Sequence, residues 1–166
     1  MSALRVASRS IVRARQAATF AVRGAVRGYA DVPTDKIRLS LTLPHQALYS
    51  NVDVVQVNIP ATTGELGVLA NHVPTIEELK PGIVDIVEES GSTKQFFVSG
   101  GFAVVQPGSL LSINAVEAYP VEDFSAEAVR TQLAEAQKNA TTGSEIDQVE
   151  AKIELEVLEA LAAVAK

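Results

Sequence analysis

Cysteine and tryptophan are absent from this 166-residue sequence, and only two histidines, His45 and His72, occur in it. Without cysteine the chain can form no disulfide, no thiolate zinc site and no thiol nucleophile. Apolar runs are also short, and none approaches the roughly 18 uninterrupted residues that a membrane-spanning helix requires. We therefore expect a globular chain with one core and a small appendage, which does not cross a membrane.

Catalytic motifs are missing as well. The sequence contains neither HExxH nor GxSxG, and each histidine stands apart from other candidate ligands or bases. A nucleophilic triad would have to combine a histidine with a serine and an acid that no recognised motif presents. We expect His72 to be a hydrogen-bonded turn residue, and we predict no catalytic residue, no metal and no cofactor.

Two glycine clusters, Gly64–Gly67 and Ser99–Gly101, could suggest phosphate binding. A phosphate cradle needs GxxxxGK[ST] or GxGxxG between a strand and a helix, so that the helix N-terminus faces the anion. Here the pattern predicts strands on both sides of each cluster. We therefore expect these glycines to supply positive φ angles in hairpins.

Charge divides the chain into two unlike parts. Six of the 14 basic residues precede the first acid, Asp31, so residues 1–30 carry a charge of +6. The remaining residues hold eight basic and 20 acidic side chains, a charge of −12. An acidic body repels phosphate, so we expect no nucleic-acid partner.

The first thirty residues have the pattern of a mitochondrial transit peptide. Arg5, Arg9 and Arg13 recur every four residues, which places them on one face of an amphipathic helix whose other face is apolar. The alternative is a basic arm that binds RNA or lipid, which the acidic remainder argues against. We predict cleavage near Tyr29 or Ala30, so that the fold begins at about residue 31.

The body of the chain has the period of strands. Leu39, Leu41 and Leu43 alternate with polar residues, and so do Val55, Val57 and Ile59. Further short apolar runs are separated by turn signals about every ten residues. Because no helical stretch could cross between parallel strands, we predict an antiparallel β-sandwich of about 8 to 10 short strands over residues 31–122. The further short apolar runs, each expected to form a strand, are residues 83–87, 96–98, 102–105 and 110–116.

The tail changes to the helical period. Val129, Leu133 and Ala136 form one stripe after a candidate N-cap at Ser125, and Ser144 begins a second helix with a capping-box-like spacing to Asp147. We predict an α-helical hairpin over residues 123–166. The second helix has more apolar surface than one thin partner can cover, so its own sandwich or another subunit should pack there. Its apolar positions are Ile146, Val149, Ile153, Val157, Ala160, Leu161 and Val164, with Leu155 and Leu158 on a flank.

Four short stretches follow one another in the body: GELGVLANHVPT at 64–75, LKPG at 79–82, VSGGF at 98–102 and VQP at 105–107. Their sequence and order, with the import signal and the hairpin, resemble the mitochondrial delta subunits of F-type ATP synthase, the counterparts of bacterial epsilon subunits. The resemblance runs over about residues 35–166. It implies a noncatalytic rotor subunit at the foot of the central stalk, on the matrix side of the inner membrane and peripheral to it.

The resemblance also implies partners and a mechanism. The chain would bind the gamma subunit and the c-ring, with the mitochondrial epsilon subunit alongside. Proton flow would turn the c-ring, and the rotation would reach the α/β catalytic sites through gamma. Gly64, Glu65, Leu66 and Gly67 resemble the family's loop that faces the c-ring, and His72 matches the family histidine in the same motif.

Some bacterial relatives bind ATP through the hairpin, with an acid three residues before an Arg-Ala pair. Glu127 and Arg130 keep that spacing, but glutamate replaces aspartate and Thr131 replaces alanine, which argues against nucleotide binding.

Three functions remain for the chain, in this order: a rotor coupling subunit, a nucleotide-sensing module, and an unrelated matrix enzyme or ligand-binding sandwich.

Overall fold

The computed structural model describes residues 35–142 and 144–165, which comprise the body and the tail. The predicted transit peptide, its processing site at Tyr29 or Ala30 and the predicted start of the sandwich at residue 31 lie outside the described residues.

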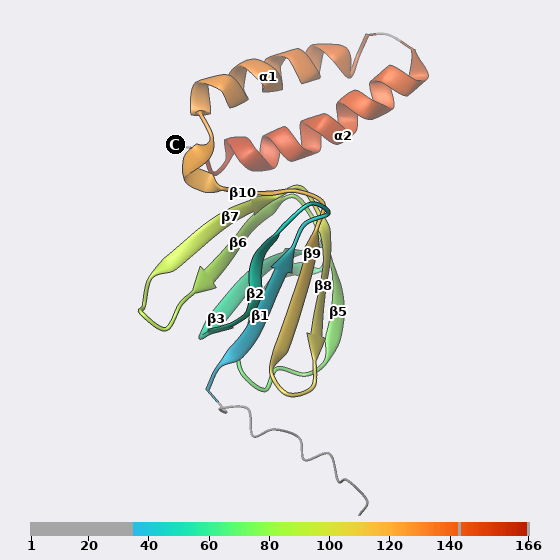
Figure 1. Cartoon of the computed structure of the whole chain (residues 1–166). Coiled ribbons are helices and arrows are strands. Elements are labelled where there is room, and N and C mark those ends of the chain that lie inside the picture. Colours follow the sequence, from blue (N-terminus) through green and yellow to red (C-terminus); the bar gives the residue numbers. More distant parts are fainter. Residues whose placement is uncertain (1–34, 143, 166) are drawn as a thin grey trace, which may run out of the picture.

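Ten strands fold into two layers, and two helices cover one end of them (Figure 1). This confirms the predicted β-sandwich followed by a helical hairpin. The strands are β1 (Ile37–Thr42), β2 (Ala47–Val54), β3 (Gln56–Ala61), β4 (Gly64–Val68), β5 (Thr75–Leu79), β6 (Gly82–Val87), β7 (Thr93–Val98), β8 (Gly101–Gln106), β9 (Leu110–Ala115) and β10 (Ala118–Pro120).

Hydrogen bonding joins the strands in the order β10-β7-β6-β3-β5-β8-β9-β1-β2, and β4 pairs with β3 outside this path. Our prediction that all neighbours are antiparallel is wrong in one place, because β1 pairs with β9 in parallel, with Leu39 opposite Leu111. No crossover helix is needed there, since seven strands separate the two along the chain.

Alternation of apolar and polar residues builds the core, as the sequence predicts. Ile37, Leu39 and Leu41 of β1 are buried, and the residues between them are half-exposed. The second predicted strand begins one residue late: Val55 is exposed between β2 and β3, and burial starts at Val57. The strands close around one apolar core, so the sandwich is a single packed body.

The two helices begin where their caps predict. The Ser125 hydroxyl accepts a hydrogen bond from the Ala128 N–H at the start of α1 (Ala126–Asn139). Ser144 and Asp147 form a complete capping box at the start of α2 (Glu145–Ala162). At the end of α1, the hydroxyls of Thr141 and Thr142 both donate to the Lys138 carbonyl oxygen, which also accepts from the Thr141 N–H at 3.3 Å.

The apolar stripe of α2 divides into two halves. Toward its end, Val157, Ala160 and Val164 pack on a small cluster around Phe97 of β7, Val129 of α1 and Leu161. Toward its start, the same stripe is exposed. The residues that α2 buries are Ala151, Leu158 and Leu161, so part of the predicted main stripe stays uncovered and Leu158, predicted as a flank, is buried.

Aromatic rings join the sandwich to the hairpin. The ring of Phe124, which follows a 3-10 turn η1 (Val121–Asp123), lies edge-on to Phe97 and to Tyr119, with centroids 5.7 and 6.2 Å away. Such pairs contribute about 0.5–1.5 kcal/mol beyond the area they bury. The hairpin is therefore held to the sandwich mainly at its root, next to β7 and β10 (Figure 1).

Candidate functional site

The predicted c-ring-facing residues lie on a strand rather than in a loop. Gly64, Glu65, Leu66 and Gly67 belong to β4, which forms a hairpin with β3, so the predicted loop is wrong as a description of their structure. Edge pairing explains the difference, because β4 bonds only to β3 and lies outside the path of the main sheet. Glu65 is exposed opposite Pro60, and Leu66 packs against the core.

The glycines of this hairpin serve different purposes. Gly64 has a φ of +135°, which side chains rarely adopt, and so confirms the expected turn chemistry. Gly67 does not have a positive φ, and our expectation is wrong there. A Cβ at Gly67 would lie 3.3 Å from the Asn58 side-chain oxygen, so what glycine allows there is close packing across the hairpin.

His72 lies in a turn beyond the other end of β4. Its N–H donates to the Leu69 carbonyl oxygen at 3.2 Å, and its Nδ1 lies 2.8 Å from the Val73 carbonyl oxygen, which fixes the proton on Nδ1. This confirms His72 as a hydrogen-bonded turn residue. The structure does not bring it together with Glu65, because β4 runs on from Glu65 to Val68, a rise of about 10 Å at about 3.3 Å per residue, before the turn with His72 begins.

The turn that holds His72 is anchored to the β8–β9 turn. The hydroxyl of Ser109, the one buried polar residue of the described chain, accepts a hydrogen bond from the Asn71 N–H at 2.9 Å. The Ser109 carbonyl oxygen accepts from the Arg38 N–H at 2.8 Å. Three segments far apart in the sequence are thus fixed at the sandwich end away from the helices.

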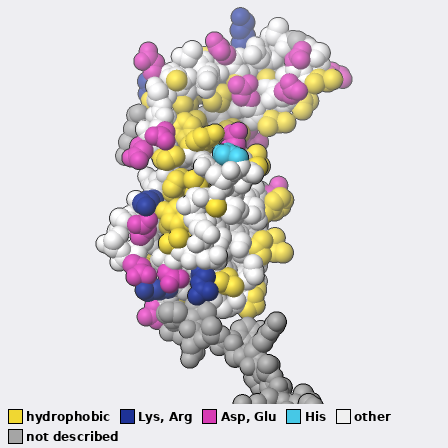
Figure 2. All heavy atoms as spheres, viewed as in Figure 1, with side chains coloured by type: hydrophobic (Ala, Val, Ile, Leu, Met, Phe, Trp, Pro, Cys, Tyr) yellow, Lys and Arg dark blue, Asp and Glu magenta, His cyan; other side chains and the backbone are white. Residues whose placement is uncertain are grey.

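The outer face of β5 and β8 carries exposed apolar side chains. Ile76 and Val73 are each 71% exposed, and Phe102 is 55% exposed; we call these three residues the β5–β8 patch. Figure 2 shows apolar side chains along the edge of the sandwich where β5 lies in Figure 1. We did not predict the patch from the sequence. The sequence signal for it is a pair of adjacent apolar residues in one strand. Successive side chains of a strand point to opposite faces, so Phe102 faces outward when its neighbour Ala103 is buried.

The exposed half of the α2 stripe is a second apolar surface. It consists of Ile146, Val149 and Ile153, which are 71%, 54% and 61% exposed, and we call it the α2 row. Carboxylates of Glu145, Glu150, Glu154 and Glu156 and a single lysine, Lys152, stand on the same helix. Figure 2 shows apolar and acidic side chains together on the helical hairpin. The row therefore suits an apolar surface with basic residues beside it.

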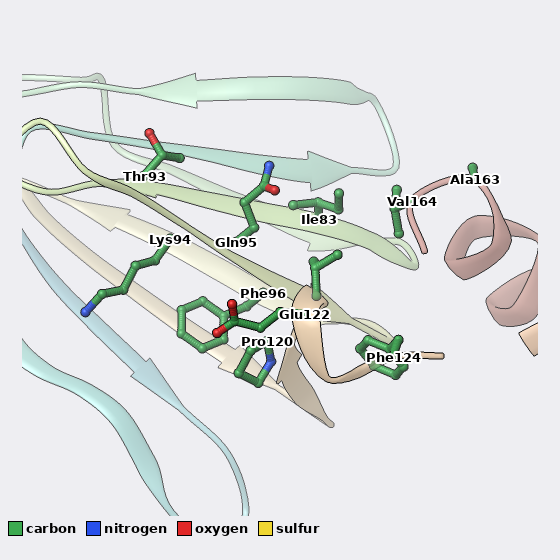
Figure 3. Close-up of a pocket in the computed structure, with 11 residues that line it drawn as sticks. Ile83, Thr93, Lys94, Gln95, Phe96, Pro120, Glu122, Phe124, Ala163 and Val164 are labelled. Atoms are coloured by element: carbon green, nitrogen blue, oxygen red, sulfur yellow. The ribbon is translucent and has the colours of Figure 1, made fainter. Parts of the chain in front are cut away.

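A groove of about 820 Å³ lies at the junction of the sandwich and the hairpin (Figure 3). Its apolar lining comes from β6, β7, the end of β10, the segment that follows β10, and the residues just after α2. The residues that line it include Ile83, Thr93, Gln95, Phe96, Pro120 and Val164.

One cluster of charges borders this groove, and it is internally paired. Lys94 Nζ lies 2.7 Å from Glu88 Oε1, and the Tyr49 hydroxyl donates to the same oxygen at 3.3 Å. The hydrogen bond from Lys94 lowers the pKa of Glu88, while burial is the main cause of the raised pKa of Tyr49. The pKa of Lys94 is raised by the same hydrogen bond, so all three shifts move away from neutral pH.

Glu127 and Arg130, which keep the spacing of the ATP-binding motif of some bacterial relatives, lie about one turn apart on α1. Glu127 and Arg130 are both exposed, on either side of the buried Val129. The Thr131 hydroxyl donates to the Glu127 carbonyl oxygen at 3.0 Å, so the residue that departs from the family pattern is engaged with the helix backbone.

Residues 35–142 and 144–165 contain no group of three or more histidine or acidic side chains arranged to hold a metal ion. Within the same ranges, no helix is long and apolar enough to cross a membrane. The surfaces that remain as candidates are therefore the β3–β4 hairpin, the β5–β8 patch, the α2 row and the groove.

Comparison with protein families matches both halves of the chain. Residues 36–121 match the family described as ATP synthase, Delta/Epsilon chain, beta-sandwich domain. Residues 124–163 match the family described as fungal epsilon subunit of F1F0-ATP synthase, C-terminal domain.

Individual relatives agree. The chain is 65% identical over 169 residues to the mitochondrial ATP synthase subunit delta of Neurospora crassa, covering 100% of both chains. It is 60% identical to that of Yarrowia lipolytica, over 92% of this chain and 94% of the relative. A chain in the solved OSCP/F1/c-ring assembly of Euglena gracilis mitochondrial ATP synthase matches with a TM-score of 0.75 and 34% identity, over 82% of this chain and 85% of that one.

Proposed function

The chain belongs to the family of ATP synthase delta and epsilon chains, and from that premise we propose that it is a noncatalytic central-stalk subunit of mitochondrial F1Fo ATP synthase. In this role it fixes the c-ring to the gamma subunit on the matrix side of the inner membrane. Proton-driven rotation then reaches the α/β catalytic sites through gamma.

The observation that carries this proposal is the contrast between a fully packed interior and exposed apolar surfaces. Soluble monomers rarely leave contiguous apolar surface uncovered, so such a surface indicates a partner. Val73, Ile76 and Phe102 would be buried against a large, rigid neighbour. We assign the β5–β8 patch to the gamma subunit, because a flat sheet face suits a broad, stiff contact.

The α2 row supports a second partner. Its apolar side chains lie beside several carboxylates, so its partner should present apolar side chains with lysine or arginine at their border. We assign this surface to the mitochondrial epsilon subunit. The row continues the stripe that already packs on the sandwich, so a partner there would brace the hairpin against the sandwich.

The β3–β4 hairpin is our assignment for the c-ring. Glu65 is exposed on the outer strand of this hairpin, while Leu66 beside it packs against the core. A side chain on a strand anchored in this way transmits force with less slack than one on a free loop. Glu65 would contact the ring as a positioning residue without a chemical step.

The physical requirement of this function is stiffness. A stiff body passes rotation from one partner to the next with little twist of its own, and a close-packed β core has low compressibility. The described residues contain no buried side-chain polar atom without a hydrogen-bond partner, which fits a passive rigid body. Glu127 and Arg130 have no assigned role in this mechanism, and we propose no cofactor.

The proposal is tested by purifying the tagged chain from detergent-solubilised mitochondria under a stringent wash and identifying what remains bound. We expect gamma, epsilon and c subunits to be recovered together. Recovery of the chain alone, with the rest of the ATP synthase intact in the flow-through, would contradict the proposal.

The assignment of Glu65 needs its own variant. We expect Glu65→Lys to impair coupling between proton flow and ATP synthesis while the subunit still assembles. Glu117→Lys is the matched control, since Glu117 is also an exposed carboxylate but lies between β9 and β10, outside the surfaces assigned to partners. Equal coupling in wild type and Glu65→Lys would remove Glu65 from the interface.

A further inference from the structure

The outer edge of β7 is only half covered. β10 pairs with three of its residues, Val98, Phe97 and Phe96, and ends at Pro120. The chain then turns away into η1, so no described strand lies beside Thr93 and Gln95 on this side. An edge of this kind is a template for another strand.

The register shows where the backbone groups of this edge point. In an antiparallel pair, alternate residues bond to the neighbour. The Glu88 N–H donates to the Ser92 carbonyl oxygen, which makes 94 and 96 the residues that bond to β6. The N–H and carbonyl groups of Thr93 and Gln95 therefore point outward, away from β6.

These outward groups open into the groove of Figure 3. Thr93 and Gln95 line it together with apolar side chains from both faces of the sheet. In the figure, Ile83 and Val164 lie on one side of the edge, and Phe96 and Pro120 lie on the other. The free backbone groups thus lie between two walls that each carry apolar side chains, as an entering strand with alternating side chains requires, and Lys94 and Glu122 line the groove as well.

We propose that this groove receives an extended segment of a partner subunit, which adds to β7 as a strand in line with β10. The inference rests on the proposed place of the chain in a rotor. The occupant is a single strand rather than the sheet of a second copy, because the open stretch of β7 is only Thr93–Gln95 and is flanked by η1 and by the residues that follow α2. Its side chains are apolar toward Phe96 and toward Ile83, and its backbone bonds to Gln95 and Thr93.

Proline at position 95 tests this directly. Gln95→Pro removes the outward N–H without removing a bond to β6, and edge strands tolerate proline when the missing N–H faces outward. Gln95→Ala is the matched control, because it alters the side chain and leaves the backbone groups in place. Both full-length variants are expressed in cells without another copy of the chain, and the ATP synthase is purified.

We expect Gln95→Ala to assemble like wild type and Gln95→Pro to be retained about five- to tenfold less under a stringent wash, which is the effect of one lost hydrogen bond. Melting temperatures of the isolated variants should be nearly equal. Amide exchange of the assembled enzyme should show protection at Thr93 and Gln95 that the isolated chain lacks.

Three outcomes would overturn the inference: equal retention of both variants, an unprotected Gln95 amide in the assembled enzyme, or a dimer of the isolated chain that Gln95→Pro abolishes. If Gln95→Pro also fails to fold, the amide-exchange comparison on wild type still decides. If wild type itself is absent from the purified ATP synthase, the proposed function fails, which is a different result from equal retention of two assembled variants.

Discussion

The sandwich and the hairpin are stabilised in different ways. Strands from all parts of the sandwich bury their apolar side chains in one core, with Leu39, Val84 and Ile113 fully buried. The hairpin buries only a few side chains on each helix and leaves the start of α2 uncovered. We therefore expect the sandwich to fold as a rigid body by itself, whereas the hairpin depends on docking at its root and on partners.

The largest effect should come from Gly101 in the sandwich. A Cβ at this position would lie 2.2 Å from the Asn114 carbonyl oxygen, and its φ is +147°. We expect Gly101→Ala to lower the free energy of unfolding by about 3–5 kcal/mol, from overpacking and backbone strain together. Gly91→Ala, in an open turn with φ +82°, should lower it by only about 1 kcal/mol. Urea denaturation compares them, and equal losses would refute the role of packing at Gly101.

A smaller and more local effect is expected at the root of the hairpin. Phe124→Ala removes the ring that lies between Phe97 and Tyr119. We expect about 2 kcal/mol of lost docking, because the ring is only partly buried and the site can relax. Amide exchange should accelerate in α1 and α2 while the strands keep their protection. Equal acceleration in both regions would show that the two fold as one cooperative unit.

The capping box of α2 should have an effect of about 1 kcal/mol. Ser144→Ala removes the hydroxyl that accepts from the Asp147 N–H at 3.3 Å, a typical N-cap loss. Circular dichroism during thermal unfolding would report this as an earlier loss of helix. Ser125→Ala, at the weaker 3.5 Å cap of α1, should lose less, and a larger loss there would contradict the ranking.

The same capping box predicts a dependence on pH. The hydrogen bond from the Ser144 backbone N–H holds the pKa of Asp147 below its usual 3.8. Since the folded pKa is depressed, the stabilisation is present above the unfolded pKa and is lost as pH falls through the folded one. The stability difference between wild type and Asp147→Asn should therefore disappear in acid below 3.8. A constant difference down to that range would show that the Asp147 carboxylate does not stabilise the cap.

The smallest effect on stability is expected at the α2 row. Ile153→Ala removes an exposed side chain and should change the free energy of unfolding by less than about 0.5 kcal/mol. Assembly with the proposed partner should nevertheless weaken. Lys152→Ala, the neighbouring exposed position, is the control, and a loss of stability without a loss of assembly would reverse the assignment.

The architecture could be predicted from the sequence because its signals are local. Period-two alternation located β1 and most of β3, and Ser125 and Ser144 marked the helix starts, since caps depend on near neighbours. The parallel pairing of β1 with β9 could not be predicted, because its partners, such as Leu39 and Leu111, lie far apart in the sequence and no local pattern connects them.

The surfaces were harder to predict because exposure is not a local property. The apolar stripe of α2 has one period along its length, yet Val157 is covered and Ile153 is not, since the sandwich ends beneath it. The free edge at Gln95 likewise depends on where β10 stops. The loop prediction for Gly64–Gly67 failed because a short glycine-containing strand lacks the alternation that identifies longer ones.

The proposed role of this chain is to couple rotation without catalysing a reaction. The decisive measurement is proton-gradient-driven ATP synthesis and ATP hydrolysis by the ATP synthase of mitochondria depleted of the chain, before and after the mature chain is added back. We expect depletion to abolish synthesis while F1 still hydrolyses ATP, and we expect the added chain to restore synthesis. Full coupling in its absence, or turnover by the isolated chain, would contradict the proposed role.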